Sequence, residues 1–137
     1  MITEQQFIAI ILKNKALSAV AEKAARLELN NWYVGAGVLC QTYWNYVHGF
    51  PLQTHIRDID LVYFEDADLS WEKENEYIQK AQQVFKTLSL KIDLKNQARV
   101  HLWYAEKFGY EIKPYDSIKS AIDTWPTTAT AMGLTKT

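Results

Sequence analysis

The sequence predicts a single domain of the α+β class, because strand-like segments are interspersed with amphipathic helices along the whole chain. Its 137 residues suit one domain that buries a sizeable core. Hydrophobic residues make up 48% of the chain and aromatic residues 13%, a composition that excludes a disordered polypeptide. No repeat or low-complexity segment divides the sequence, so we expect residues 1–137 to fold as one unit.

Three segments have the composition and periodicity of β-strands. Trp32 to Val34 is short and leads into Gly-Ala-Gly, whereas His55 to Phe64 is rich in β-branched and aromatic residues. Leu90 to Lys95 alternates between apolar and charged residues, which is typical of a strand with one buried face. The final residues, Thr127 to Thr137, are expected to begin a strand with nothing after it to pair.

Helical spacing of apolar residues predicts helices between and around these strands. A capping box, Thr3-Glu4-Gln5-Gln6, marks the start of the first helix, and Ser70 is placed to cap a later one. We assign packing roles, and no chemistry, to the first two helices. The predicted helices span Glu4 to Lys13, Ala16 to Leu29, Ala36 to His48, Trp71 to Thr87, Ala98 to Phe108 and Asp116 to Thr124.

Charge and cysteine content narrow the possible function classes. Fifteen basic and 16 acidic residues leave a net charge of −1, so a polyanionic partner has to be held locally rather than by a global positive field. The single cysteine, Cys40, excludes an internal disulfide and fits a reducing cytoplasm. The apolar run Phe7 to Leu12 is too short to span a membrane. We expect a cytoplasmic protein with no membrane partner and no signal peptide.

Asp58 and Asp60 of the second predicted strand are candidate ligands of a metal ion. Because side chains alternate between the two faces of a strand, both carboxylates point to the same face. Two neighbouring carboxylates repel each other, and a divalent cation such as Mg²⁺ or Mn²⁺ relieves that repulsion. An exposed strand end whose acids face water explains the same pattern, and Asp-x-Asp alone favours that simpler interpretation.

Two further features stand on either side of this pair in the sequence. Lys91, Asp93 and Lys95 share one face of the third strand, either as charges that guard an edge strand or as a third carboxylate with lysines for phosphate. Gly35 and Gly37 lie between a strand and a helix N-terminus, where backbone N–H groups can bind a phosphate. Most such turns are only tight connections, and the spacing fits neither the dinucleotide fingerprint nor the P-loop.

Four blocks occur in a characteristic order: Trp32-Tyr33-Val34-Gly35-Ala36-Gly37, Arg57 to Phe64, Lys95 to His101, and Thr124 to Ala131. Together they resemble a nucleotidyltransferase-like family of the DNA polymerase β-type nucleotidyltransferase superfamily. The resemblance extends from about residue 30 to the end of the chain, and the Asn-Gln-Ala-Arg-Val-His block is its most specific part. It implies a palm-type core in which a small mixed β-sheet is backed by helices.

The resemblance also implies a site in which acids hold Mg²⁺ or Mn²⁺ against the triphosphate of an NTP. By matching positions, Asp58 and Asp60 are the catalytic metal-binding pair, and Asp93 is the third carboxylate, a metal ligand or the general base. The residues expected to contact the nucleotide are Gly35, Gly37, Lys95, Asn96 and Arg99.

The implied function is metal-dependent transfer of an NMP group from an NTP to the hydroxyl of an unknown acceptor. The acceptor is a small molecule, an RNA or a protein, and the near-neutral charge makes a long nucleic acid the least favoured of these. Two alternatives stay open on the same fold: a non-catalytic nucleotide-binding module and a toxin–antitoxin-type interaction module. Chains of the resembled family continue past the Thr-Ala-Thr segment, so we expect the domain to be truncated at its C-terminus.

Overall fold

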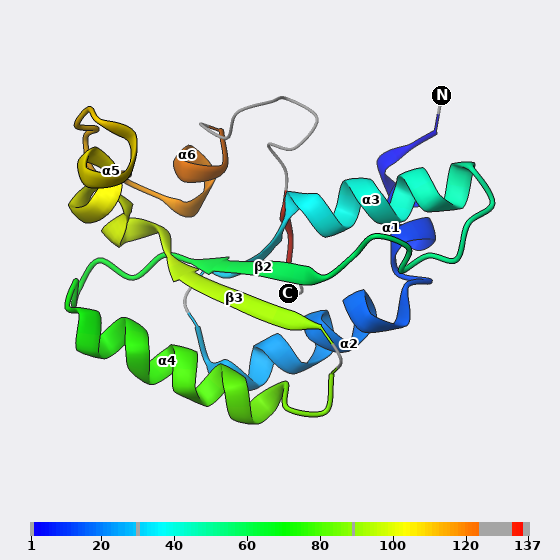
Figure 1. Cartoon of the computed structure of the whole chain (residues 1–137), viewed down its shortest axis with the longest axis horizontal. Coiled ribbons are helices and arrows are strands. Elements are labelled where there is room, and N and C mark those ends of the chain that lie inside the picture. The colour runs from blue at the N-terminus through cyan, green and yellow to red at the C-terminus, as the bar shows by residue number, and fades with distance from the viewer. Residues whose placement is uncertain (1, 30, 89, 124–132, 136–137) are drawn as a thin grey trace.

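A mixed four-stranded β-sheet with helices around it forms the body of the protein (Figure 1). The computed structural model describes residues 2–29, 31–88, 90–123 and 133–135. The strands are β1 (Tyr33–Gly35), β2 (Asp58–Tyr63), β3 (Lys91–Asn96) and β4 (Gly133–Leu134). The α-helices are α1 (Glu4–Ile11), α2 (Lys15–Ala24), α3 (Ala36–Val47), α4 (Trp71–Val84), α5 (Val100–Phe108) and α6 (Ile118–Asp123), with short 3₁₀ turns η1 (Ala25–Leu27) and η2 (Gln97–Arg99).

The strand order is β3-β2-β1-β4, so the second strand in sequence lies between the first and the third. β1 pairs antiparallel with both β2 and β4, whereas β2 and β3 run parallel. Parallel neighbours need a crossover connection, and α4 supplies it between β2 and β3. The fold is therefore the α+β, mixed-sheet arrangement that the sequence predicts.

The first helix begins where the sequence predicts and the second begins one residue earlier, and both end earlier than predicted. Thr3 and Gln6 form the expected capping box at the start of α1. Asn14 caps α2 by accepting from the backbone of Ala16 and Leu17, and its amide donates to Thr42 of α3. The predicted second helix reaches Leu29, but α2 stops at Ala24 because the chain tightens into η1 and then turns through a left-handed residue.

The two faces of the sheet are packed differently. Ile59, Leu61 and Tyr63 of β2 belong to the main core, which α2, α3 and α4 also supply. Val62 and Phe64, on the other face, belong to a smaller cluster with α6 and the turn after β3. In Figure 1, α2 and α4 lie below β2 and β3, while α5 and α6 lie above one end of these strands. Among the described residues, α5 and α6 thus cover the second face at one end.

The end of the chain pairs with the first strand. The sequence predicts a terminal strand with nothing after it to pair, and Gly133 and Leu134 pair back with Gly35 and Val34 of β1. A Cβ at position 133 would lie 2.9 Å from the Tyr33 Cβ, so glycine permits this close approach. Residues 124–132, which include the start of the predicted strand, lie outside the described residues.

The other predicted elements shift by a few residues at their ends. The helix predicted to begin at Ala98 begins at Val100, because residues 97–99 form η2 first, and it ends at Gly109 as expected. Ser70 caps α4 by accepting from the Lys73 backbone. In the part of the chain that the structure describes, no helix has the length and apolarity needed to cross a membrane.

Candidate active site

The acid pair lies on the less covered face of β2, as the alternation predicts. Asp58 and Asp60 are exposed, whereas the intervening Ile59 and the following Leu61 are buried in the main core. The orientation of the two carboxylates is fixed because the apolar residues determine which face of β2 is buried. A slip by one residue would bury both carboxylates.

Asp93 comes to the same place from the neighbouring strand. The parallel register pairs Asp60 with Asp93 and Asp58 with Lys91. Leu94 is buried in the main core, so Asp93 and Lys95 project to the opposite face, together with the acids of β2. Side chains of paired residues in adjacent strands are close neighbours. The fold therefore sets two of the three predicted acids side by side, with Asp58 one pleat away.

Electrostatics show that these carboxylates affect one another. Partial burial raises the pKa of Asp60, the negative charges of Asp93 and Asp58 raise it further, and the nearby Lys95 ammonium opposes them. Lys95 Nζ also lies 3.6 Å from an Asp93 carboxylate oxygen. Negative charge is thus in excess here, and Lys95 offsets part of it.

The acids have the donor chemistry that Mg²⁺ or Mn²⁺ requires, because both ions prefer carboxylate oxygens. Their arrangement is not a ready-made cluster, since no group of three or more His, Cys, Asp or Glu residues in the described ranges is positioned to hold a metal ion. The register gives the reason: Asp58 is paired with Lys91 rather than with an acid. Side chains have to turn toward a cation for all three to bind it.

The glycine turn lies beside the acids. Gly35 ends β1 and is the N-cap residue of α3. Tyr33 pairs with Val62 and Val34 with Leu61, so the same antiparallel register continued by one residue sets Gly35 opposite Asp60. Gly37 is exposed in the first turn of α3, and a Cβ there would meet nothing within 4 Å. Free backbone N–H groups at the start of α3 therefore lie next to Asp60.

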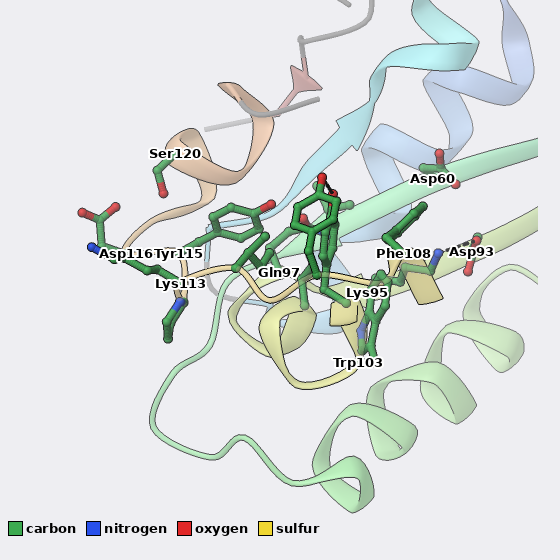
Figure 2. Close-up of a pocket in the computed structure, with 16 residues that line it drawn as sticks. Asp60, Asp93, Lys95, Gln97, Trp103, Phe108, Lys113, Tyr115, Asp116 and Ser120 are labelled. Carbon is green, nitrogen blue, oxygen red and sulfur yellow. Dashed lines mark hydrogen bonds and ion pairs between the residues drawn. The ribbon is translucent and has the colours of Figure 1, made fainter. Parts of the chain in front are cut away.

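A cavity of about 750 Å³ extends from the acids toward α5 and α6 (Figure 2). Its size is that of a small-molecule site. At one end its polar lining comes from β2, β3 and η2, at Asp60, Asp93, Lys95 and Gln97. Most of the remaining wall is aromatic: Trp103, Tyr104, Phe108, Tyr110 and Tyr115. Further polar groups, Lys113, Asp116 and Ser120, line the part that Figure 2 shows farthest from the two acids.

Comparison with known proteins identifies the family. The model of a nucleotidyltransferase family matches residues 22–137. The chain belongs to this nucleotidyltransferase family. The match confirms the relationship that the four sequence blocks indicate. None of the curated proteins matches the chain.

The fold of this chain has a counterpart among solved structures. An NMR structure described as revealing a CCA-adding enzyme head domain aligns with a TM-score of 0.75 and 24% sequence identity. The alignment covers 97% of this chain and 65% of that one. This chain therefore spans about two thirds of that protein's length. At this identity the likeness shows the fold, and it agrees with the palm-type core that the sequence predicts.

The side chains of Asn96 and Arg99 lie away from the acids. Asn96 follows Lys95 on β3 and so turns to the opposite face, where its backbone N–H donates to Glu74 of α4. Arg99 donates to the same carboxylate over 2.7 Å and to the Leu69 carbonyl. These two side chains were expected to contact phosphate or sugar. In the structure the Asn96 side chain exchanges hydrogen bonds with the Glu65 backbone and accepts from the Ala98 backbone N–H, and the Arg99 side chain joins η2 to α4.

Sequence reasoning missed Gln97 as a site residue. Its side chain lines the cavity, and the period of two that places Asp93 and Lys95 on this face extends to position 97. That alternation is the signal that could have found it. Gly35 and Gly37 lie near the acids, but neither is among the residues that line the cavity.

Proposed function

We propose that this chain transfers a nucleotidyl group from an NTP to an acceptor hydroxyl with the help of a divalent cation bound by Asp58, Asp60 and Asp93. The observation that carries the proposal is the parallel register of Asp60 with Asp93, with Asp58 on the same face and the glycine turn adjacent. A family match alone does not say which residues form the site. The register supports the proposal that the site lies at these acids.

The reaction assigns a role to each group, and two roles to Asp93, which serves as a cation ligand and as the general base. The acceptor oxygen forms a bond to the α-phosphorus while the bond from that phosphorus to the bridging oxygen of the β-phosphate breaks, and pyrophosphate leaves with the electron pair. Asp93 takes the proton of the attacking hydroxyl. A bound Mg²⁺ or Mn²⁺ supplies charge neutralisation on the phosphate oxygens.

The surrounding residues hold the nucleotide in place. The backbone at Gly35 and Gly37, at the N-terminus of α3, donates hydrogen bonds to phosphate oxygens. The Lys95 ammonium lies 3.6 Å from an Asp93 oxygen, and on its flexible side chain it would neutralise oxygens of a triphosphate held at the acids. Asn96 and Arg99 position β3 and η2 rather than the nucleotide.

The reaction is tested with NTPs labelled at the α-phosphate, incubated with Mg²⁺ and with candidate small-molecule, RNA and protein acceptors. We expect release of pyrophosphate that needs the cation. A cation contributes several kcal/mol to the transition state, so Asp60→Asn should lower the rate roughly 10²–10³-fold. The matched control is Asp66→Asn, an exposed acid in the loop after β2 that does not line the cavity.

Nucleotide binding without turnover is the second candidate function. The ion pair between Lys95 and Asp93 favours it, because the ammonium neutralises the carboxylate that a cation would otherwise occupy. In that case NTPs bind, but no acceptor becomes labelled and no pyrophosphate appears. Equal pyrophosphate release from the wild type and Asp60→Asn would contradict the catalytic proposal.

A further inference from the structure

Gln97 is a largely buried polar residue whose side chain lies at the wall of the cavity. It is the first residue of η2, only 6% exposed, and it lines the cavity. Its backbone carbonyl accepts from Val100, as the turn requires. Within the described residues, nothing forms a hydrogen bond with the side-chain amide.

The amide of Gln97 is accessible from the cavity. It is not among the fully enclosed side-chain atoms without a partner in the described residues, which are the Tyr63 hydroxyl and His101 Nδ1. The amide can donate two hydrogen bonds and accept two. Because it faces the cavity and no other described side chain or backbone group hydrogen-bonds to it, a bound molecule can form these hydrogen bonds.

The position of Gln97 indicates which part of a ligand it meets. It lies four residues after Asp93, about 13 Å along a strand. A molecule whose phosphates lie at the acids has to extend along the cavity to reach it. Figure 2 draws Gln97 in the middle of the lining, between the labels of Lys95 and Tyr115.

The neighbouring wall has the character of a stacking surface. Tyr104 packs against Phe108 at 4.6 Å and Tyr110 at 5.3 Å between ring centroids, and the two tyrosine hydroxyls are 2.9 Å apart. Phe108 and Tyr110 nevertheless stay 51% and 60% exposed. Aromatic rings of this kind stack on any nucleobase, since every base has a π-face.

We propose that Gln97 and the aromatic wall form the nucleoside subsite, in which the NTP base lies against the rings and hydrogen-bonds to the Gln97 amide. This inference rests on the proposed function and adds the residue that reads the base. An amide pairs well with a base edge that offers a donor beside an acceptor. Stacking supplies affinity for all four bases, and Gln97 supplies the preference among them.

The test compares ATP, GTP, CTP and UTP with inorganic tripolyphosphate, each titrated with Mg²⁺ into the wild type and Gln97→Leu. Losing hydrogen bonds to the base should weaken binding of the preferred NTP about 10-fold. The affinities of the four NTPs should then converge, while tripolyphosphate binds as before. The matched control is Gln83→Leu, an exposed glutamine of α4.

Thermal unfolding without ligand gives a second readout that separates a ligand-binding role from a structural one. Because the amide faces the cavity and forms no hydrogen bond within the described residues, Gln97→Leu should change the Tm by no more than about 2 °C. A larger fall in Tm would mean that the amide stabilises the fold, and it would overturn the inference.

The remaining outcomes separate this inference from the function it rests on. If the wild type binds the NTPs but Gln97→Leu binds them equally well, or loses tripolyphosphate to the same degree, Gln97 does not read the base. If the wild type binds neither the NTPs nor tripolyphosphate, the proposed function fails and the subsite with it. Should Gln97→Leu not fold, Tyr110→Leu replaces it, with Trp44→Leu, at a 58% exposed site outside the cavity, as its control.

Discussion

Asp60 is the residue of the site whose charge is most affected by its neighbours. Its partners on both sides are acids, Asp58 on its own strand and Asp93 on the next, and Lys95 is the nearby cation that opposes them. Burial and these two charges raise its pKa. Folding therefore disfavours the ionised carboxyl, and the sequence keeps an acid where an amide would be more stable.

The raised pKa gives a stability prediction with a definite sign. The folded state favours protonated Asp60, so this stabilisation is complete below the ordinary carboxyl pKa of about 4 and is lost as pH rises through the raised value. Asp60→Asn cannot ionise. Its Tm should exceed that of the wild type at pH 7, and the difference should shrink as pH falls toward about 4.

Thermal unfolding followed across this pH range checks the prediction, with Asp66→Asn as the control. Adding Mg²⁺ at pH 7 should raise the Tm of the wild type and leave that of Asp60→Asn unchanged, because the cation relieves repulsion that the amide variant no longer has. A lower Tm for Asp60→Asn at pH 7 would show that Asp60 is stabilised by its surroundings, contrary to the raised pKa.

Between elements, one buried ion pair connects α4 to the end of β3. Glu74 and Arg99 side chains are 8% and 13% exposed, and Glu74 also accepts the Asn96 backbone N–H. Removing one partner of a buried pair leaves the other uncompensated. Glu74→Ala should lower the free energy of unfolding by about 3 kcal/mol, measured by urea denaturation.

The same helix provides the comparison for that prediction. Lys73 and Glu76 form an exposed pair at 3.5 Å. Glu76→Gln should change stability by no more than about 0.5 kcal/mol, because water screens an exposed pair. Equal effects of Glu74→Ala and Glu76→Gln would show that burial does not set the strength of the Glu74–Arg99 pair.

At the start of α3, a substitution of Gly37 is expected to affect stability and nucleotide binding in opposite directions. Alanine is favoured over glycine in a helix, and a Cβ at this position meets nothing within 4 Å. Gly37→Ala should therefore raise the free energy of unfolding by up to about 1 kcal/mol. If phosphate approaches this turn closely, the new methyl group lowers affinity for ATP. A more stable variant with unchanged ATP affinity would remove Gly37 from the site.

For the whole molecule, the sequence predicted the helices and strands better than it predicted how the strands pair. Alternation placed Asp58 and Asp60 on one face because Ile59 and Leu61 have to be buried. It could not supply the register between β2 and β3, which pairs Asp60 with Asp93, since register depends on how α4 crosses the sheet. The pairing of β4 with β1 was missed for the same reason.

The polar residues after Lys95 were the hardest to interpret from sequence. Asn96, Gln97 and Arg99 lie in one block, and nothing in their chemistry says which of them face the cavity. Asn96 and Arg99 bind Glu74, a partner 22 or more residues away in sequence, whereas Gln97 alone lines the cavity. Contacts between distant segments decide such roles, and no local pattern encodes them.

The most direct test of the site is cation binding by the intact chain. Mn²⁺ is titrated calorimetrically, with a non-hydrolysable ATP analogue present, into the wild type, Asp60→Asn and Asp66→Asn. If the acids of β2 and β3 hold the cation, Mn²⁺ binds the wild type and Asp66→Asn with equal affinity, and binding to Asp60→Asn is lost. Absence of Mn²⁺ binding in the wild type, or equal binding in all three proteins, would contradict a cation site at Asp60.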